Sequence, residues 1–304
     1  MRALPLPPQW PAVHLFTVHL EDYFQGNVFE RVVDREAWGS MPARVENNAE
    51  QLLQVLDTHQ TSATFFALGW IADRYPRLIR RILDQGHEVA SLGYWHKRVT
   101  SMSPKAFREE VRASKARLEQ VTGVPCLGFR APSFSIRQGM EWAFQILVEE
   151  GYRYDSSMFP ISRPDYGYPS APRVPVKLET KSGTLLELPL ATARLAGLRL
   201  PAAGGGYLRQ LHPGLVTNAF SHWGEMGISA VFYVHAWEID PGQPRLRCNL
   251  LTRIRRYRNL HKTQPRLHQL LDQMRFTSIQ SRFSAALSPA PEATSFSEPT
   301  QPAA

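Results

Sequence analysis

The chain has few cysteines. Only Cys126 and Cys248 occur among its 304 residues, and neither has a Cys or His nearby at zinc-finger spacing. The sequence therefore indicates neither a disulfide framework nor a structural zinc site, and both thiols are expected to stay reduced. It also lacks a run of about 18 apolar residues that could span a bilayer, and residues 1–14, with four prolines, lack the apolar stretch of a secretion signal. These absences predict a cytoplasmic protein.

Excess charge is confined to one segment. The net charge is +8, and the 31 residues from Arg245 to Arg275 hold nine basic residues against one acid. The remainder is neutral, which argues against a protein that is basic throughout to wrap nucleic acid, so no nucleic-acid partner is expected. Residues 245–275 could make a weak contact with a membrane surface or an anionic glycan, or could simply form a solvated helix face.

Short β-branched or aromatic runs alternate with amphipathic stretches along the chain. This pattern is typical of strands separated by crossover helices, so we predict an α/β fold with a largely parallel sheet. Polar residues follow several strands directly, and in a parallel barrel they lie on the C-terminal rim, where active sites are assembled. We expect strands at 13–20, 62–68, 87–91, 126–130, 184–190 and 229–234, helices at 44–57, 71–85, 103–121 and 140–150, and a loop at 155–175.

One domain is predicted. Because 43% of the residues are apolar, the chain can bury a substantial core. Residues 1–12 are interpreted as an N-terminal extension and 13–283 as the domain, including C-terminal helices within 250–275. A tail at 284–304, composed mostly of Ser, Pro, Ala, Thr and Glu, is expected to be disordered.

The C-terminal helices have a recognisable pattern. Leu250, Ile254 and Tyr257 share one helix face, which we expect to point inward, so that the arginines of this segment face solvent. Thr263 is expected to cap the second helix, with Pro265 in its first turn.

Ionisable side chains gather in five short segments. After the first strand, His19 and Glu21 share one face of the strand and Asp22 lies at the turn. An acid here could bind a metal, accept a proton or cap the next helix. Another segment has an arginine and a proline at a turn, which can aim backbone N–H groups at an oxyanion. This arginine is Arg130, and the same segment holds Ser133. The other three segments supply Tyr94, Trp95 and His96; Asp155; and His235 and Trp237.

Taken in this order, the segments resemble the polysaccharide deacetylases with a NodB homology domain, most closely those associated with exosortase and exopolysaccharide gene clusters. The resemblance covers about Phe16 to Ile279. It implies a distorted (β/α) barrel of about seven strands, with C-terminal helices packed on it. It also implies hydrolysis of N-acetyl groups on an amino-sugar exopolysaccharide, assisted by a divalent metal, usually zinc. The matching blocks also include residues 188–189, 204–207, 235–244 and 257–260.

The resemblance implies catalytic roles for four residues. His235 matches the general acid, and Arg130 matches the arginine that orients the base. Asp155 matches a loop aspartate with an orienting role. Ser133 matches the residue whose backbone N–H faces the oxyanion.

The resemblance also implies a metal site and a substrate-binding rim. Either Glu21 or Asp22 matches the acidic metal ligand, and His96 matches the second histidine of the metal-binding pair. The aromatic residues expected to contact substrate are Tyr94, Trp95 and Trp237.

Two positions depart from the family pattern. His19 stands where the family has the aspartate base, and Leu92 stands where it has the first metal-binding histidine. Catalytic zinc sites usually have three protein ligands, so His19 could replace the missing ligand or the missing base, but not readily both. Three alternatives follow: an intact deacetylase, a weakened or inactive barrel that still binds polysaccharide or a partner, and an altered chemistry.

Overall fold

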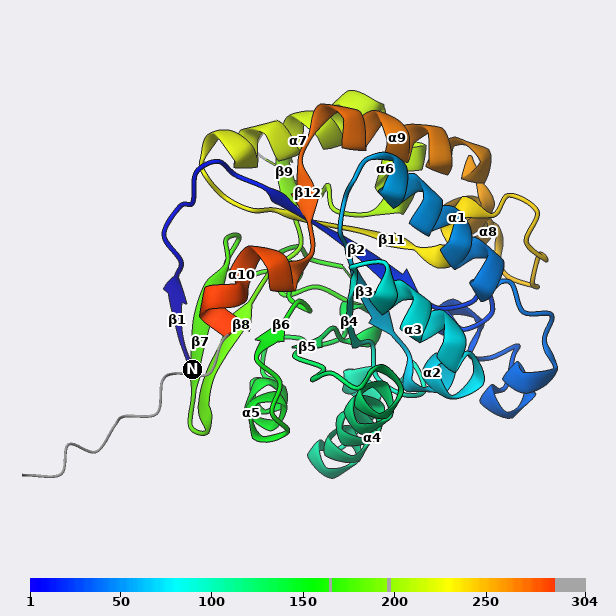
Figure 1. Cartoon of the computed structure of the whole chain (residues 1–304), viewed down its shortest axis with the longest axis horizontal. Coiled ribbons are helices and arrows are strands. Elements are labelled where there is room, and N and C mark those ends of the chain that lie inside the picture. The colour runs from blue at the N-terminus through cyan, green and yellow to red at the C-terminus, as the bar shows by residue number, and fades with distance from the viewer. Residues whose placement is uncertain (164–165, 196–197, 288–304) are drawn as a thin grey trace, which may run out of the picture.

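A sheet forms the centre of the computed structural model, which describes residues 1–163, 166–195 and 198–287 (Figure 1). Its strand order is β1–β7–β8–β6–β5–β4–β3–β2–β11, and β12 pairs with β2 outside this path. From β8 to β11 in this order, each of the seven strands runs parallel to the next, whereas β7 is antiparallel to β8. The strand bounds are β1 Arg2–Pro5, β2 His14–Leu20, β3 Thr64–Ala67, β4 Glu88–Ser91, β5 Gly128–Phe129, β6 Tyr154–Asp155, β7 Val176–Thr180, β8 Gly183–Glu187, β11 Val231–His235 and β12 Phe276–Thr277.

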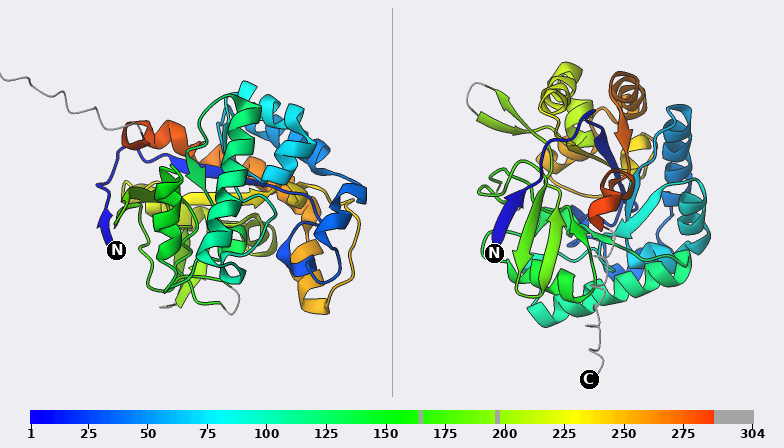
Figure 2. Two further views of the ribbon diagram at one scale, coloured as in Figure 1. Left: turned by 90° about the horizontal axis from the view of Figure 1, so that it is seen from below. Right: turned by 60° about the vertical axis from the view of Figure 1, so that its left-hand side comes forward.

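The two ends of this parallel run approach each other. Leu190, just beyond β8, forms a parallel bridge with Val231 of β11. Helices ring the strands (Figure 2). The predicted α/β class is therefore confirmed, although hydrogen-bond ladders among the described residues do not close the barrel completely. Strands β9 (Thr192–Leu195) and β10 (Leu198–Pro201) form a separate hairpin.

Helices cover the outside of the sheet, with α7 and α9 together along one side and α2, α3 and α4 along another (Figure 1). Among the described helices, none has the length and apolar character needed to cross a bilayer. Their bounds are α1 Val45–Thr58, α2 Gly69–Arg74, α3 Pro76–Asp84, α4 Pro104–Thr122, α5 Trp142–Glu149, α6 Gly205–Gln210, α7 Pro213–Glu225, α8 Leu250–Tyr257, α9 Thr263–Gln273 and α10 Ile279–Leu287, with short 3-10 turns at Asn27–Phe29, Arg35–Ser40, Val99–Ser101, Pro132–Phe134, Ala236–Ile239 and Leu260–Lys262.

Capping residues and prolines set several helix boundaries. Ser103 caps α4, because its hydroxyl oxygen accepts a hydrogen bond from the N–H of Ala106 at 3.2 Å. The single helix predicted at 71–85 is wrong. It is divided into α2 and α3 at Pro76, since a proline inside a helix has no N–H to donate and disfavours a helical conformation for the preceding residue.

Both predicted terminal boundaries also need correction. Residues 1–12 are more than an extension, because β1 pairs antiparallel with β7 and the N–H of Leu6 donates to the carbonyl of Pro175 at 2.9 Å. The predicted tail begins too early, since α10 continues to Leu287 and buries that side chain. The rest of the predicted tail, 288–304, lies outside the described residues.

The C-terminal helices form as predicted, and α9 buries Leu267 and Leu270 as expected, but α8 buries a different face. Leu250 and Ile254 of α8 are 72% and 41% exposed, whereas Arg256 is buried. The expectation of an inward aliphatic face and outward arginines is therefore wrong at these positions, because Arg256 turns into the protein. Thr263 starts α9 without capping it, and its buried hydroxyl has no hydrogen-bond partner among the described residues.

Gly128 of β5 leaves room for the ring of Tyr154 on the neighbouring strand β6. A Cβ atom at position 128 would collide with this ring, which is fully buried and whose hydroxyl donates to Glu88 at 2.8 Å. We expect Gly128→Ala to lower the free energy of unfolding by about 2 kcal/mol, as overpacking in a rigid core does. Urea denaturation measures this change, and Gly39→Ala is the control because its Cβ would meet no atom within 4 Å. Unchanged stability would show that the Tyr154 ring can move aside.

Candidate active site

The candidate residues lie at the C-terminal ends of the parallel strands. Glu21 follows β2, His96 lies five residues beyond β4, and Arg130 directly follows β5. Asp155 ends β6 and His235 ends β11. Because parallel strands end at the same edge of a sheet, residues far apart in the sequence come together there.

Glu21 is the centre of this cluster. Its Oε1 accepts hydrogen bonds from Nδ1 of His235 at 2.8 Å and from Nε1 of Trp237 at 3.1 Å. Its Oε2 lies 2.7 Å from Nε2 of His96, an ion-pair distance without the alignment of a hydrogen bond. Burial alone would raise the pKa of Glu21, but His96 and His235 hold this pKa well below its ordinary value. The carboxylate is therefore ionised between two imidazoles.

Asn27 fixes the proton on His96. With its amide nitrogen facing His96, Asn27 donates to Nδ1 and to the backbone oxygen of His96, while its amide oxygen accepts from Nε of Arg98 at 2.9 Å. Since Nδ1 accepts a hydrogen bond, the ring proton lies on Nε2, the atom 2.7 Å from Glu21 Oε2. In this arrangement His96 has no free lone pair.

Asp22 has a structural place instead. Its Oδ2 accepts from the backbone N–H groups of Arg44 and Val45, at 2.7 and 3.1 Å, and its Oδ1 accepts from that of Tyr23 at 2.8 Å. Three amide donors thus occupy the carboxylate at the start of α1. Of the two acids that could match the metal ligand, Glu21 reaches the histidines, and Asp22 caps a helix.

His19 is held by Arg130. Nη1 of Arg130 lies 3.1 Å from Nε2 of His19, which is 2% exposed. A guanidinium can only donate, so Nε2 is the acceptor and Nδ1 carries the proton. Burial, with further contributions from His235 and Arg130, holds the pKa of His19 well below its ordinary value. The lone pair needed for either predicted role of His19, as metal ligand or as base, is therefore already used.

Arg130 is fully buried at the end of β5 and donates to three further acceptors. Its Nε and Nη2 donate to the carbonyl and the hydroxyl of Ser156, at 2.9 and 2.7 Å, and its Nη1 donates to Thr17 Oγ1 at 2.7 Å. The guanidinium lies 4.0 Å from the centre of the Phe66 ring. Burial lowers its pKa to about 9. Arg130 was predicted to orient the base. In the structure it instead holds the neutral imidazole of His19.

Asp155 forms its hydrogen bonds with Ser157 rather than with His235. Its carboxylate accepts from the N–H and the hydroxyl of Ser157, at 2.9 and 2.6 Å, and it is paired in register with Glu187 on the neighbouring strand β8. Burial raises the pKa of Asp155, and burial together with the Asp155 charge raises the pKa of Glu187 well above its ordinary range. This shift favours the neutral form of the Glu187 carboxyl group. Asp155 was expected to have an orienting role, but the acid that contacts His235 is Glu21.

Ser133 lies in a turn with unusual backbone angles. Ser133 and Phe134 have φ values of 55° and 52°, and His96 has a φ of 52°. Residues other than glycine rarely adopt this left-handed conformation, and it clusters at functional sites. The role of the Ser133 N–H in facing an oxyanion stays a prediction.

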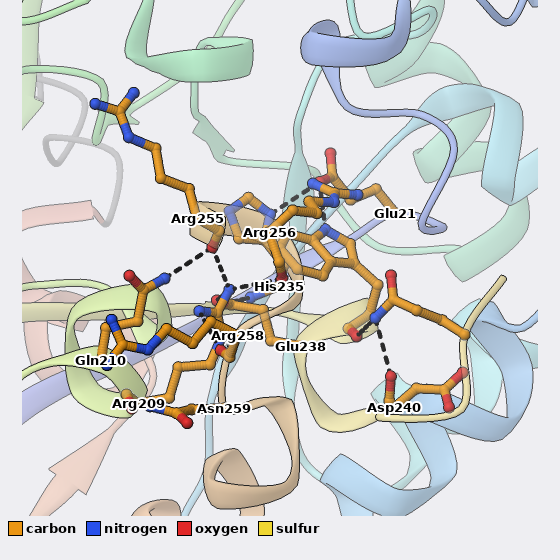
Figure 3. A network of polar contacts seen from close by, with 12 residues as sticks. Glu21, Arg209, Gln210, His235, Glu238, Asp240, Arg255, Arg256, Arg258 and Asn259 are labelled. Carbon is orange, nitrogen blue, oxygen red and sulfur yellow. Dashed lines mark hydrogen bonds and ion pairs between the residues drawn. The ribbon is translucent and has the colours of Figure 1, made fainter. Parts of the chain in front are cut away.

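The sequence interpretation missed three residues of the C-terminal part. Figure 3 shows Arg256, Arg209 and Glu238 in one network with His235. The guanidinium of Arg256 lies 3.4 Å from the centre of the Trp237 ring and donates to the carbonyl of Tyr23 at 2.6 Å. Arg209 pairs with Glu238 at 3.2 Å, and Glu238 accepts from the N–H of His235 at 3.0 Å. In the sequence, the only sign of this network was Glu238, an acid three residues after His235.

The predicted substrate-binding aromatics divide into two groups. Trp237 is 4% exposed and stacks on His235 with ring centres 5.0 Å apart, so it belongs to the buried site. Trp95 lies between two cavities, of about 330 and 800 Å³, and lines both, while Tyr94 lines only the larger one. The smaller cavity also contains Trp38, whose ring centre is 6.2 Å from that of Trp95. The open aromatic surface is therefore around Trp95.

The residues present do not fit a catalytic zinc ion. Within residues 1–163, 166–195 and 198–287, no group of three His, Cys, Asp or Glu is arranged to hold a metal. Leu92, fully buried after β4, has no lone pair. Two ligands of one tetrahedral zinc lie about 3.3 Å apart, which is farther than the 2.7 Å between Glu21 and His96.

Two family models match adjacent parts of the chain. Residues 38–154 match "Polysaccharide deacetylase", and residues 156–284 match "Domain of unknown function (DUF3473)". The first segment contains Leu92, His96 and Arg130, and the second contains His235. The functional cluster is thus assembled from both segments and from β2, which precedes them.

The curated relatives match only part of their own length. An uncharacterised Bacillus subtilis protein, YlxY, is 29% identical over 134 residues, which are 43% of this chain and 40% of that protein. A peptidoglycan-N-acetylglucosamine deacetylase of Bacillus cereus is 27% identical over 94 residues, 31% of this chain and 34% of that protein. The chain therefore spans about a third to two fifths of these relatives.

Solved structures share the fold over nearly the whole chain. A Mycobacterium smegmatis protein assigned to the polysaccharide deacetylases has a TM-score of 0.61 at 20% identity, covering 94% of this chain and 95% of that one. Puue allantoinase has a TM-score of 0.60 at 18% identity, covering 92% and 94%. At these identities the likeness concerns the fold alone. Residues 38–154 are thus similar to the polysaccharide deacetylases, both in the family model and in the curated relatives.

Proposed function

We propose that the chain is a polysaccharide deacetylase-like protein that binds an N-acetylated amino-sugar polysaccharide, in exopolysaccharide biosynthesis, without hydrolysing it. The observation that carries the proposal is the pairing of Glu21 with His96 and His235. An acid engaged by two imidazoles, beside a leucine at the third ligand position, lacks the open metal site that amide hydrolysis in this family requires.

His19 supports the same conclusion. A general base needs a free lone pair within reach of the water it activates, and Nε2 of His19 instead accepts from Arg130 at 3.1 Å. Burial also lowers the pKa of His19, so it has little tendency to take a proton at neutral pH. The site thus lacks both an open metal-binding position and a free general base.

The polysaccharide is proposed from the relatives and from the surface around Trp95. Two similar proteins are a peptidoglycan-N-acetylglucosamine deacetylase and a chitooligosaccharide deacetylase, which by their names act on N-acetylated glycans. Indole rings present flat apolar faces on which a sugar ring can pack, and Trp95 lies between two adjoining cavities. The exposed part of this site therefore suits recognition of a glycan.

A second candidate function is metal-dependent deacetylation. It is favoured by the convergence of Glu21, His96 and His235, and by the 23% exposure of the His235 side chain, which a general acid needs. This function requires His96 to turn from Glu21 and the chain to bind metal. The two candidates differ in metal content and in acetate release.

The test combines binding with chemistry. We expect purified protein to bind N-acetylglucosamine oligomers in calorimetry, to release no acetate, and to be unaffected by a chelator. Trp95→Ala should weaken binding about tenfold, since a stacked aromatic ring contributes on the order of 1 kcal/mol. Trp10→Ala is the matched control, because Trp10 is 66% exposed and lines neither cavity. Chelator-sensitive acetate release by the wild type would instead establish the second candidate.

A further inference from the structure

Helix α8 exposes three aliphatic side chains at the edge of the molecule. Leu250, Leu251 and Ile254 are 72%, 56% and 41% exposed. Isolated exposed aliphatic residues are common, but three within five residues of one helix form a contiguous apolar surface. Viewed from below, this helix projects at the periphery (Figure 2). The surface therefore has the position of a contact site.

The orientation of α8 is fixed by its other face. Arg256 points into the site network, where it contacts Trp237 and the carbonyl of Tyr23, while the Arg255 side chain points away from it (Figure 3). Arg209 donates to the carbonyls of Arg255 and Arg256, at 3.0 and 3.1 Å. The helix is held by buried polar bonds, so the aliphatic residues cannot turn inward without breaking them.

Arginines accompany the exposed aliphatic residues. Arg247, Arg253 and Arg255 are exposed, and none of them forms an ion pair with a carboxylate in the described part of the chain. No Asp or Glu occurs between Asp240 and Asp272. We name this surface the α8 patch, comprising Arg247, Leu250, Leu251, Arg253, Ile254 and Arg255. Its charge is complementary to an anionic partner.

We propose that the α8 patch docks the protein onto an anionic lipid bilayer. Aliphatic side chains next to arginines suit the boundary between acyl chains and phosphate headgroups, where the apolar residues insert and the guanidiniums pair with phosphate. A soluble anionic glycan would use the arginines but leave Leu250 and Leu251 in water. A second copy of the chain would bring like charges together. Of these three partners, the bilayer satisfies both parts of the patch.

The test is flotation of the full chain with vesicles. Wild-type protein should float with phosphatidylcholine vesicles containing about 30% phosphatidylglycerol, should not float with pure phosphatidylcholine, and should lose binding as salt rises. Arg253→Gln with Arg255→Gln should weaken binding about thirtyfold, the change expected from two lost cationic contacts. Leu250→Ser with Leu251→Ser should weaken it at least tenfold.

Matched controls replace similar residues elsewhere. Val32 and Val124 are 51% and 44% exposed, and their double change to Ser should leave binding unaltered, as should Arg31→Gln with Arg77→Gln. Thermal unfolding checks that each variant is folded. Undiminished vesicle binding by the folded leucine variant would overturn insertion, because charge alone would then account for it. Absence of binding to anionic vesicles, or a wild-type dimer that the leucine variant abolishes, would overturn the bilayer as the partner.

Discussion

The double variant Leu92→His, His19→Asp should gain zinc binding and deacetylase activity. Histidine at 92, four residues before His96, would supply the missing imidazole after β4. Aspartate at 19 would give Arg130 a carboxylate partner in place of the Nε2 acceptor that lies 3.1 Å from Nη1. We expect about one zinc per chain and acetate release at least ~100-fold above the background measured with the wild type, the usual contribution of a positioned general base.

The single variants separate the loss of the metal ligand at position 92 from the loss of the base at position 19. Leu92→His alone should bind zinc, which raises its melting temperature when zinc is added, because a ligand that binds only the folded state stabilises it. His19→Asp alone should bind none. Metal content, melting curves and acetate release from N-acetylglucosamine oligomers provide the readouts. Equal activity in the wild type and the double variant would mean that the assignment of positions 19 and 92 is wrong.

The protein should lose stability steeply between about pH 6.5 and pH 4. Burial, with a smaller contribution from Arg282, lowers the pKa of His14 from 6.5 to about 4. His14 is 4% exposed, and its Nδ1 accepts from the N–H of Ala230 at 3.2 Å, which requires an unprotonated nitrogen. Burial likewise lowers the pKa of His87. Between the two pKa values the unfolded chain binds a proton that the folded chain does not.

The sign and size of the change in unfolding free energy follow from the difference between the two pKa values of His14. Above pH 6.5 both states are neutral at His14, so its contribution is fully present. It falls with decreasing pH and is exhausted below about pH 4, a total loss of about 3 kcal/mol. Urea denaturation from pH 7 to pH 4 measures the slope. His14→Asn keeps an acceptor but does not titrate, so it should flatten the slope, whereas the exposed His222→Asn on α7 should follow the wild type. A His14→Asn slope equal to that of wild type would disprove this attribution.

The position of the site was predictable because the alternation of strands and crossover helices, which makes a sheet parallel, is a local pattern in the sequence. β2, β4, β5, β6 and β11 each carry a short run of apolar residues ending in a polar group, and parallel strands end at one edge. Which polar group faces which was not predictable. Asp22 and Glu21 are adjacent in sequence, and only the tertiary position of α1, whose first N–H groups bind Asp22, separates their roles.

The orientation of α8 shows a further limit of sequence patterns. Leu250, Ile254 and Tyr257 have helical spacing, and their apolar character predicts burial. The structure instead buries Arg256, because its guanidinium gains the Trp237 ring, at 3.4 Å, and the carbonyl of Tyr23. These partners are 19 or more positions away in the sequence, and an amphipathicity pattern contains no information about such distant contacts. Glu187 was missed for the same reason, since its partner Asp155 lies on another strand.

The pairing of β2 has a consequence for synthesis on the ribosome. This early strand lies between β3 and β11, and Thr17 donates to the carbonyl of Phe232, 215 residues later, at 2.8 Å. The edge of β2 that pairs with β11 therefore stays unpaired until most of the chain has been translated. Unpaired strand edges promote aggregation. A fragment limited to residues 38–154 would lack β2 altogether and leave an edge of β3 open. We expect nascent chains of this protein to depend on chaperones until β11 emerges.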